Sequence, residues 1–170
     1  MPHDVDQAHL GAWMSFLQAH AAVVGAVEGD LQGERGLALS WYEVLARLSR
    51  QPDQAMRMQE LAQGALLSKS GLTRLVDRMQ AAGLVERRAC AEDRRATYAA
   101  MTAAGGRALA DAEPTFLRSL QKHFAEHVDC QEVGSFLAAL RRLIEGNGQR
   151  VLGECHSSPG AGRKLEAAPA

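Results

Sequence analysis

Short polar and basic side chains gather in one stretch of the sequence, at the spacing of a single helix face. In chain order they are Ser68, Lys69, Ser70, Thr73, Arg74 and Arg78. Serine and threonine hydroxyls can approach base edges closely, and an arginine can donate two parallel hydrogen bonds to guanine O6 and N7. These residue types indicate contact with the major groove of DNA. The alternative is an ordinary amphipathic surface helix.

A second polar group follows in residues 89–96, where Arg94 and Arg95 stand next to Asp93. Arginines at a hairpin tip beside such a helix are positioned for phosphates or for a minor groove, whose negative potential attracts them. Asp93 alone would repel DNA, so we expect it to pair with a neighbouring arginine and to shape the loop. Residues 57–107 contain nine basic and five acidic side chains in a chain of net charge −1, which is a local basic footprint.

The sequence offers little for catalysis or metal binding. It has no Gly-rich phosphate loop, nucleophile elbow or HExxH motif, so we expect neither an enzyme nor a cofactor. His123 and His127 have the spacing of two metal ligands on one helix face, but no third ligand is apparent, so exposed or interface histidines are favoured. Cys90, Cys130 and Cys155 form no CxxC pair, which favours a reducing cytosol. At Cys90 an inert thiol is favoured over an oxidation-sensitive one.

Helical periodicity predicts the elements that must position these side chains. A long amphipathic helix is expected over residues 5–31, before Gly33 and Gly36 break it. Residues 40–43, with the sequence SWYE, have the spacing of a capping box and open a second helix. That helix must stop before Pro52, because the residue before a proline disfavours helical geometry.

The polar and basic face belongs to a helix expected over residues 69–82. A short helix over 58–65 and a turn precede it, Ser68 is its expected N-cap, and Gly83 is suited to the left-handed position that ends it. Its other face is apolar and predicts burial of Leu72, Leu75, Val76 and Met79.

Two short extended runs, 84–88 and 97–101, joined by the charged loop, predict a β-hairpin. Helices are expected over 102–127, interrupted or kinked near Pro114, and over 130–145. We therefore expect a mainly α fold in which a short helix, a turn, a polar-faced helix and a hairpin form a winged helix-turn-helix.

These segments resemble the MarR (multiple antibiotic resistance) family of regulators. The most specific are MQELAQGALLSKSGLTRLVDRMQAAGLVERR, the wing EDRRA, and MTAAG at the start of the next helix. The resemblance implies a homodimer joined by the first and the last two helices. Its two recognition helices would lie roughly 34 Å apart on a pseudo-palindromic site in double-stranded DNA. It further implies that Arg95 enters a minor groove.

The resemblance also implies an organisation for the chain, with an N-terminal dimerisation helix (1–36), a DNA-binding lobe (37–101) and C-terminal dimerisation helices (102–146). Residues 147–170 are rich in Gly, Ser, Pro and Ala, and this composition predicts a disordered tail. Such regulators usually repress their own or neighbouring genes, and many release DNA when a small aromatic or anionic effector binds. The first helix lacks the early cysteine of the peroxide-sensing branch, and the ligand cluster of the zinc-sensing branch is missing.

Trp13, His20 and Tyr42 could line an effector cavity between the dimer helices and the DNA-binding lobe, although Trp13 on an apolar stripe is more often a core residue. The acidic N-terminal segment does not resemble a signal peptide, and no uninterrupted apolar run reaches the roughly 20 residues of a membrane span. We therefore expect a soluble cytoplasmic regulator without a membrane partner. The alternative function is a winged helix that acts mainly through protein–protein contacts.

Overall fold

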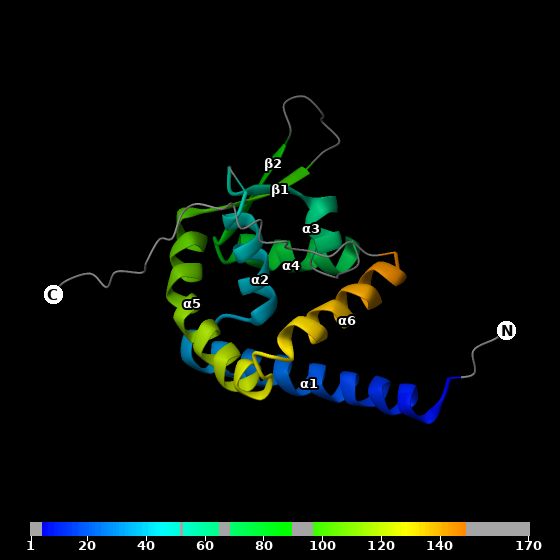
Figure 1. The fold of residues 1–170 in the computed structure, drawn as a ribbon. Coiled ribbons are helices and arrows are strands. Elements are labelled where there is room, and N and C mark those ends of the chain that lie inside the picture. The colour runs from blue at the N-terminus through cyan, green and yellow to red at the C-terminus, as the bar shows by residue number, and fades with distance from the viewer. Residues whose placement is uncertain (1–4, 52, 65–68, 90–96, 149–170) are drawn as a thin grey trace, which may run out of the picture. The chain divides into compact units, whose positions relative to one another are not determined.

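The computed structural model describes residues 5–51, 53–64, 69–89 and 97–148 of the chain (Figure 1). It divides into two compact units, residues 1–129 and 130–170, which are considered separately below. The first contains helices α1 (Gln7–Arg35), α2 (Leu39–Ser49), α3 (Met58–Gly64), α4 (Lys69–Ala81) and α5 (Ala103–His123), and strands β1 (Ala55–Arg57), β2 (Val85–Ala89) and β3 (Thr97–Met101). The second contains α6 (Val133–Gly146). The mainly helical winged-helix fold is confirmed.

The three strands form one antiparallel sheet in the order β1-β3-β2. Strands β2 and β3 confirm the predicted hairpin, in which Val85 pairs with Met101 and Arg88 with Tyr98. Strand β1 was not predicted and pairs with β3 on its other edge, where Arg57 lies opposite Tyr98. A three-residue strand is too short for an alternating pattern to be recognised in the sequence.

Helix α4 packs through the apolar stripe that the sequence predicts. Its four stripe residues, Leu72, Leu75, Val76 and Met79, are at most 3% exposed. They join the buried side chains of α2 and β2 in one core, and each such burial stabilises the fold by about 1.5–3 kcal/mol. After the helix, Gly83 has a φ of +73°, and the Leu84 amide donates to the Met79 carbonyl at 3.0 Å. This is the expected glycine-dependent helix end.

The start of α2 differs from the prediction. The helix begins at Leu39, and its N-cap, Ala38, makes no side-chain capping bond, so the capping box predicted for residues 40–43 is wrong. The Leu39 amide instead donates to Glu28 Oε2 of α1 at 2.6 Å. A carboxylate in this place satisfies an unpaired amide and meets the positive end of the helix dipole. The sequence around residue 40 could not predict this cap, because the capping carboxylate belongs to another helix.

Helices α1 and α5 pack together along the C-terminal half of α1 (Figure 1). Their core includes Val27 and Leu31 of α1 and Ala112 of α5, and Tyr42 of α2 stacks on Phe116 with ring centroids 4.3 Å apart. Residues 5–22, in contrast, are all exposed. The apolar stripe of α1 is therefore divided between a packed end and an uncovered end.

Helix α5 continues through Pro114 and is not interrupted there, contrary to one of the two outcomes that the sequence suggested. Two residues in the same turn as the proline, Ala112 and Thr115, are 0% and 1% exposed. Packing of this turn against α1 holds the helix despite the lost amide, since tertiary contacts routinely override local propensity.

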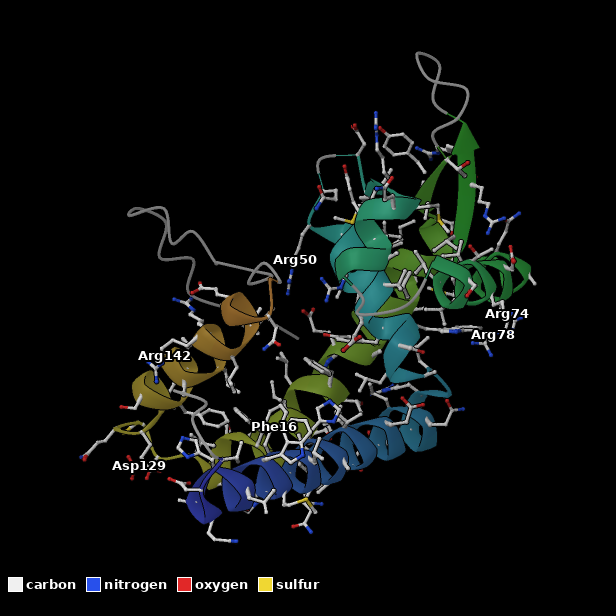
Figure 2. All side chains as sticks on the ribbon, turned by 90° about the vertical axis from the view of Figure 1, so that its right-hand side faces the viewer. Phe16, Arg50, Arg74, Arg78, Asp129 and Arg142 are labelled. Atoms are coloured by element: carbon white, nitrogen blue, oxygen red, sulfur yellow. The ribbon has the colours of Figure 1, made fainter. Side chains whose placement is uncertain are left out.

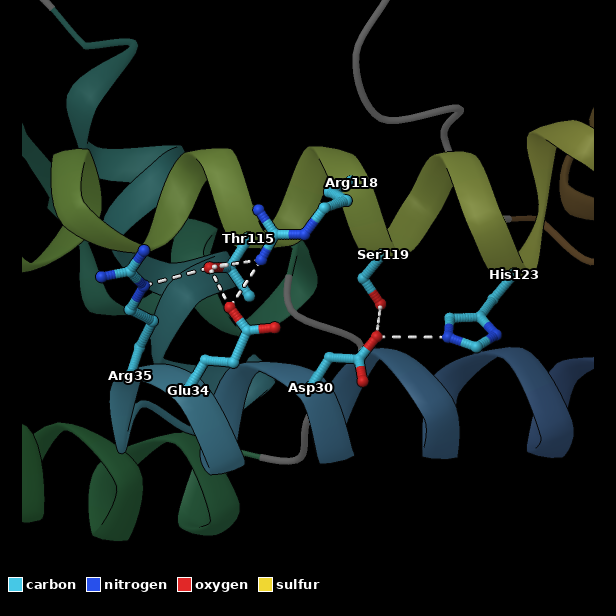
Figure 3. A network of polar contacts seen from close by, with 7 residues as sticks. All are labelled: Asp30, Glu34, Arg35, Thr115, Arg118, Ser119 and His123. Atoms are coloured by element: carbon cyan, nitrogen blue, oxygen red, sulfur yellow. Dashed lines mark hydrogen bonds and ion pairs between the residues drawn. The ribbon is translucent and has the colours of Figure 1, made fainter.

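A polar network joins α1 to α5 (Figure 3). At one end, the Ser119 hydroxyl donates to Asp30 Oδ2 at 2.7 Å, and His123 Nε2 lies 3.1 Å from the same oxygen. At the other end, the Thr115 hydroxyl donates to Glu34 Oε2 at 3.1 Å. Ser119 and Thr115 are both buried, so these bonds avoid the cost of an unsatisfied hydroxyl in the interior.

His123 and His127 do not share a helix face, so the pairing suggested by their spacing is wrong. Helix α5 ends at His123, and His127 lies in the 3-10 turn Ala125–His127. The ring of His123 turns toward Asp30 of α1. Within the described residues there is no group of three histidine, cysteine or carboxylate side chains that could hold a metal ion.

Because of this network, the folding stability should decrease at acidic pH. The hydrogen bond from Ser119 and the contact with His123 hold the pKa of Asp30 below its ordinary value. A carboxyl with a lowered folded-state pKa stabilises the fold above its unfolded-state pKa, and this contribution is lost as the pH falls through the folded-state value. We expect the melting temperature of the parent to fall more steeply than that of Asp30→Asn between about pH 5 and pH 2. Circular dichroism melts across this range measure both slopes, and parallel curves would contradict the assignment.

Among the described helices, α1 has the length and the apolar composition needed to cross a membrane. Polar residues such as Gln18 and His20 interrupt the apolar residues of α1, so its sequence contains no uninterrupted apolar run of that length. Averaged along the helix, however, its hydropathy is that of a membrane-spanning segment. Its C-terminal half is already packed against α5 through Val27 and Leu31.

Candidate nucleic-acid interface

The exposed face of α4 carries the polar and basic residues that the sequence singled out. Ser70, Thr73, Arg74 and Arg78 are all exposed, opposite the buried stripe of the same helix. Figure 2 shows the side chains of Arg74 and Arg78 pointing away from the lobe. The structure thus brings two hydroxyls and two guanidinium groups together on one exposed helix face, which is the arrangement that helix-turn-helix proteins use to enter a DNA groove.

Several site residues predicted from the sequence lie outside the described residues. They are Ser68 before α4 and Cys90, Asp93, Arg94 and Arg95 between the wing strands. Lys69 is the first residue of α4. The strands on either side of the wing are described, and β2 contacts α4 directly.

Hydrogen bonds connect the residues that follow α4 to the residues that begin α5, and this region is called the α4–α5 junction below. The Thr102 hydroxyl lies 2.7 Å from the Gly83 carbonyl, and the Thr102 amide donates to the Leu84 carbonyl at 3.1 Å. The same hydroxyl accepts the amide hydrogen of Gly105 at 3.0 Å and so caps α5. The first turn of α5 and the last turn of α4 are therefore fixed to each other by hydrogen bonds.

Known structures and a family model match this arrangement. The model of the MarR family matches residues 35–96. The structure of AbsC, a MarR family transcriptional regulator from Streptomyces coelicolor, is 30% identical in sequence, with a TM-score of 0.80 over 86% of this chain and 99% of that chain. The chain belongs to the MarR family. Its members are transcriptional regulators that bind DNA, and some respond to ligands.

Two further structures that match the chain contain bound partners. Sco3205 from Streptomyces coelicolor, solved in complex with DNA, is 25% identical and has a TM-score of 0.81 over 86% of this chain and 91% of that chain. CouR from Rhodococcus jostii RHA1, bound to p-coumaroyl-CoA, is 26% identical and has a TM-score of 0.65 over 79% and 90%. No functionally curated protein matches the chain.

Sequence reasoning missed an ion pair on α4 itself. Arg87 of β2 reaches α4, where its Nη2 lies 2.8 Å from Asp77 Oδ1. The next residue, Arg88, pairs instead with Glu86 of its own strand at 2.7 Å. Strand alternation in residues 85–89 could have separated the two arginines onto opposite faces, but it could not have named Asp77 as the partner of Arg87.

The three residues proposed from sequence to line an effector cavity are not all brought together. Trp13 and His20 both neighbour Phe16 on α1, with ring centroids 6.3 Å and 6.5 Å from it. Tyr42 is buried in the core instead, stacked on Phe116. Burial, followed by the negative charge of Glu113, raises the pKa of the Tyr42 hydroxyl.

Proposed function

We propose that this MarR family member is a homodimeric repressor that binds a pseudo-palindromic DNA site in the cytoplasm and controls its own or neighbouring genes. The two-sided character of α4 carries this proposal, because one face is fully buried and the other presents Thr73, Arg74 and Arg78. Thr73 has the size to approach base edges, and the arginines suit guanine edges or phosphates. In the same proposal, Arg94 and Arg95 contact the adjacent minor groove or its phosphates, and Asp93 shapes the wing.

The exposed apolar side chains of α1 support the homodimer. Exposed patches of this kind mark interaction surfaces in otherwise globular proteins. On α1 they are Leu10, Trp13, Met14, Phe16, Leu17 and Val24. Helix α6 separately carries exposed Val133, Phe136, Leu137, Leu143 and Ile144. A two-fold dimer would present two copies of α4 about one DNA turn apart, as an inverted repeat requires.

An effector would act by favouring a dimer whose two copies of α4 no longer match that spacing. The exposed ring surface of Trp13, Phe16 and His20 supports a small aromatic or anionic ligand, since aromatic rings stack and a histidine can pair with an anion. CouR, with its bound p-coumaroyl-CoA, gives a family precedent for such a ligand.

Selection from random duplex DNA, followed by fluorescence anisotropy at two salt concentrations, tests the proposal. We expect an enriched inverted repeat, bound by one dimer with a steep salt dependence. The same complex then serves to screen aromatic and anionic molecules for release. Weak binding without sequence preference would contradict the proposal and favour a winged helix that acts through protein partners.

Two substitutions on α4 should separate base reading from phosphate contact. Thr73→Ala should lower affinity for the selected site about tenfold and relax the preference for one base pair, with little change in salt slope. Arg78→Ala should weaken binding to all duplexes and flatten the slope of log affinity against log salt by about one unit. Anisotropy titrations on the selected site and on single-base variants measure both effects. Identical behaviour of the two variants would show that α4 does not read bases.

A further inference from the structure

The ion pair between Asp77 and Arg87 ties the exposed face of α4 to the strand that leads into the wing. The Arg87 nitrogen that contacts Asp77 Oδ1 at 2.8 Å also lies 3.4 Å from the carbonyl oxygen of Thr73. Thr73 and Asp77 are one helical turn apart on the face proposed to meet DNA. Arg87 therefore lies along that face and touches it at two successive turns.

The sheet holds Arg87 in place from the other side. Its partner in the β2–β3 ladder is Ala99, which is fully buried. Neighbouring residues across a ladder share one face of a sheet, so Arg87 leaves the sheet on the side of the core and of α4. The side chain of Arg87 is 32% exposed and that of Asp77 is 53% exposed, so the pair lies at the rim of the core within reach of solvent.

Neither folding stability nor simple attraction to DNA explains a carboxylate at this position. Ion pairs that are this exposed contribute little to folding. An unpaired Asp77 between Thr73, Arg74 and Arg78 would repel the phosphates on which binding depends. Paired with Arg87, the carboxylate is compensated and fixes the rotation of α4 about its own axis relative to β2.

We propose that Asp77 and Arg87 are a positioning pair that sets the sequence preference of α4 without either residue contacting a base. This inference rests on the proposed entry of α4 into the major groove. The bridge holds the recognition helix and the wing strand in one fixed arrangement, so that Thr73 meets its base edge while the wing meets the next groove. Without the bridge the lobe stays folded, because the apolar stripe of α4 remains packed in the core, but small shifts of α4 against β2 are less restrained.

The test compares Asp77→Asn, Arg87→Gln and the double variant with the parent, on the selected site and on a scrambled duplex of equal length. We expect each single variant to lose about tenfold in affinity for the selected site, as when one base contact is misplaced. The Asp77→Asn variant should bind the scrambled duplex at least as well as the parent does. The double variant should lose no more than either single variant, because both remove the same bridge.

Arg88→Gln is the matched control. It removes the same charge one residue further along β2, where Arg88 contacts Glu86 rather than α4. We expect it to leave the ratio of affinities for selected and scrambled duplexes unchanged. Thermal melts should show all four variants folded, with melting temperatures close to that of the parent.

Three results would overturn the positioning role. Tighter binding of Asp77→Asn to both duplexes would show that Asp77 acts only through its charge. Equal effects of Arg87→Gln and Arg88→Gln would show that Arg87 is one phosphate contact among others, and multiplied losses in the double variant would show that the two residues act independently. A parent without any sequence preference would overturn the proposed function as well, so the two failures are distinguishable.

Discussion

Gly105→Ala is expected to lower the free energy of unfolding by about 3 kcal/mol or more. A Cβ atom at this position would lie 2.1 Å from the carbonyl oxygen of Leu84, and about 3 Å from side-chain carbons of Met101 and Leu45. The carbonyl cannot simply move away, because the Thr102 amide binds it. Relief of the clash must therefore open the junction between α4 and α5 or displace the buried side chain of Leu45.

Gly106→Ala is the matched control, one residue further into the same helix. The nearest atom to its added Cβ is Met101 Cε at 3.9 Å, an ordinary contact. Replacing a helical glycine by alanine without a clash should stabilise the fold by about 0.5–1 kcal/mol. Urea unfolding followed by circular dichroism, at one protein concentration, measures both variants. Similar urea midpoints for Gly105→Ala and Gly106→Ala would show that the α4–α5 junction accommodates the added Cβ atom at little cost.

The junction was partly visible in the sequence and partly hidden. The pattern MTAAG predicted that a helix starts at residue 102, and Thr102 is the N-cap. Local patterns also placed α4 to within one residue of its C-terminus and identified its buried stripe, because helix periodicity and Gly83 act within a few residues. The need for a glycine at 105 was not visible, since the atom that excludes a side chain there belongs to Leu84.

Contacts made by residues distant in the sequence account for most of what sequence reasoning missed. Glu28 caps α2 from another helix, and Asp30 pairs with His123 at a separation of 93 residues. The bridge between Asp77 and Arg87 likewise depends on how β2 packs against α4. In each case the residue types were visible, and only the tertiary arrangement assigns their partners.

The apolar stripe of α1 shows a different limit. Helical spacing correctly grouped Leu17 with Val27 and Leu31 on one stripe. In the structure the latter two are buried, whereas Leu17 is 42% exposed. Periodicity identifies a face that must be covered, but it does not say whether the covering surface belongs to the same chain. The uncovered end is what favours a second copy of the chain as its partner.

Leu17→Glu should therefore convert the proposed dimer into a monomer and lower affinity for the complete inverted repeat by roughly 100-fold or more. An unpaired carboxylate buried in an apolar interface costs several kcal/mol, more than most single contacts contribute. A monomer can bind only one half-site, and it loses the high effective concentration of the second α4. Sedimentation equilibrium measures the association, and anisotropy on full and half sites measures the binding.

Gln18→Glu adds the same charge at the next residue, about 100° around the helix from the stripe. It should remain dimeric and bind the full site like the parent, so charge alone cannot explain the loss in Leu17→Glu. Both variants should keep the parent's affinity for a half-site, because α4 and its core lie outside the substituted face. A Leu17→Glu protein that stays dimeric would place the interface elsewhere. In that case the exposed apolar residues of α6 would become the candidate surface, and Leu137→Glu would be the corresponding substitution.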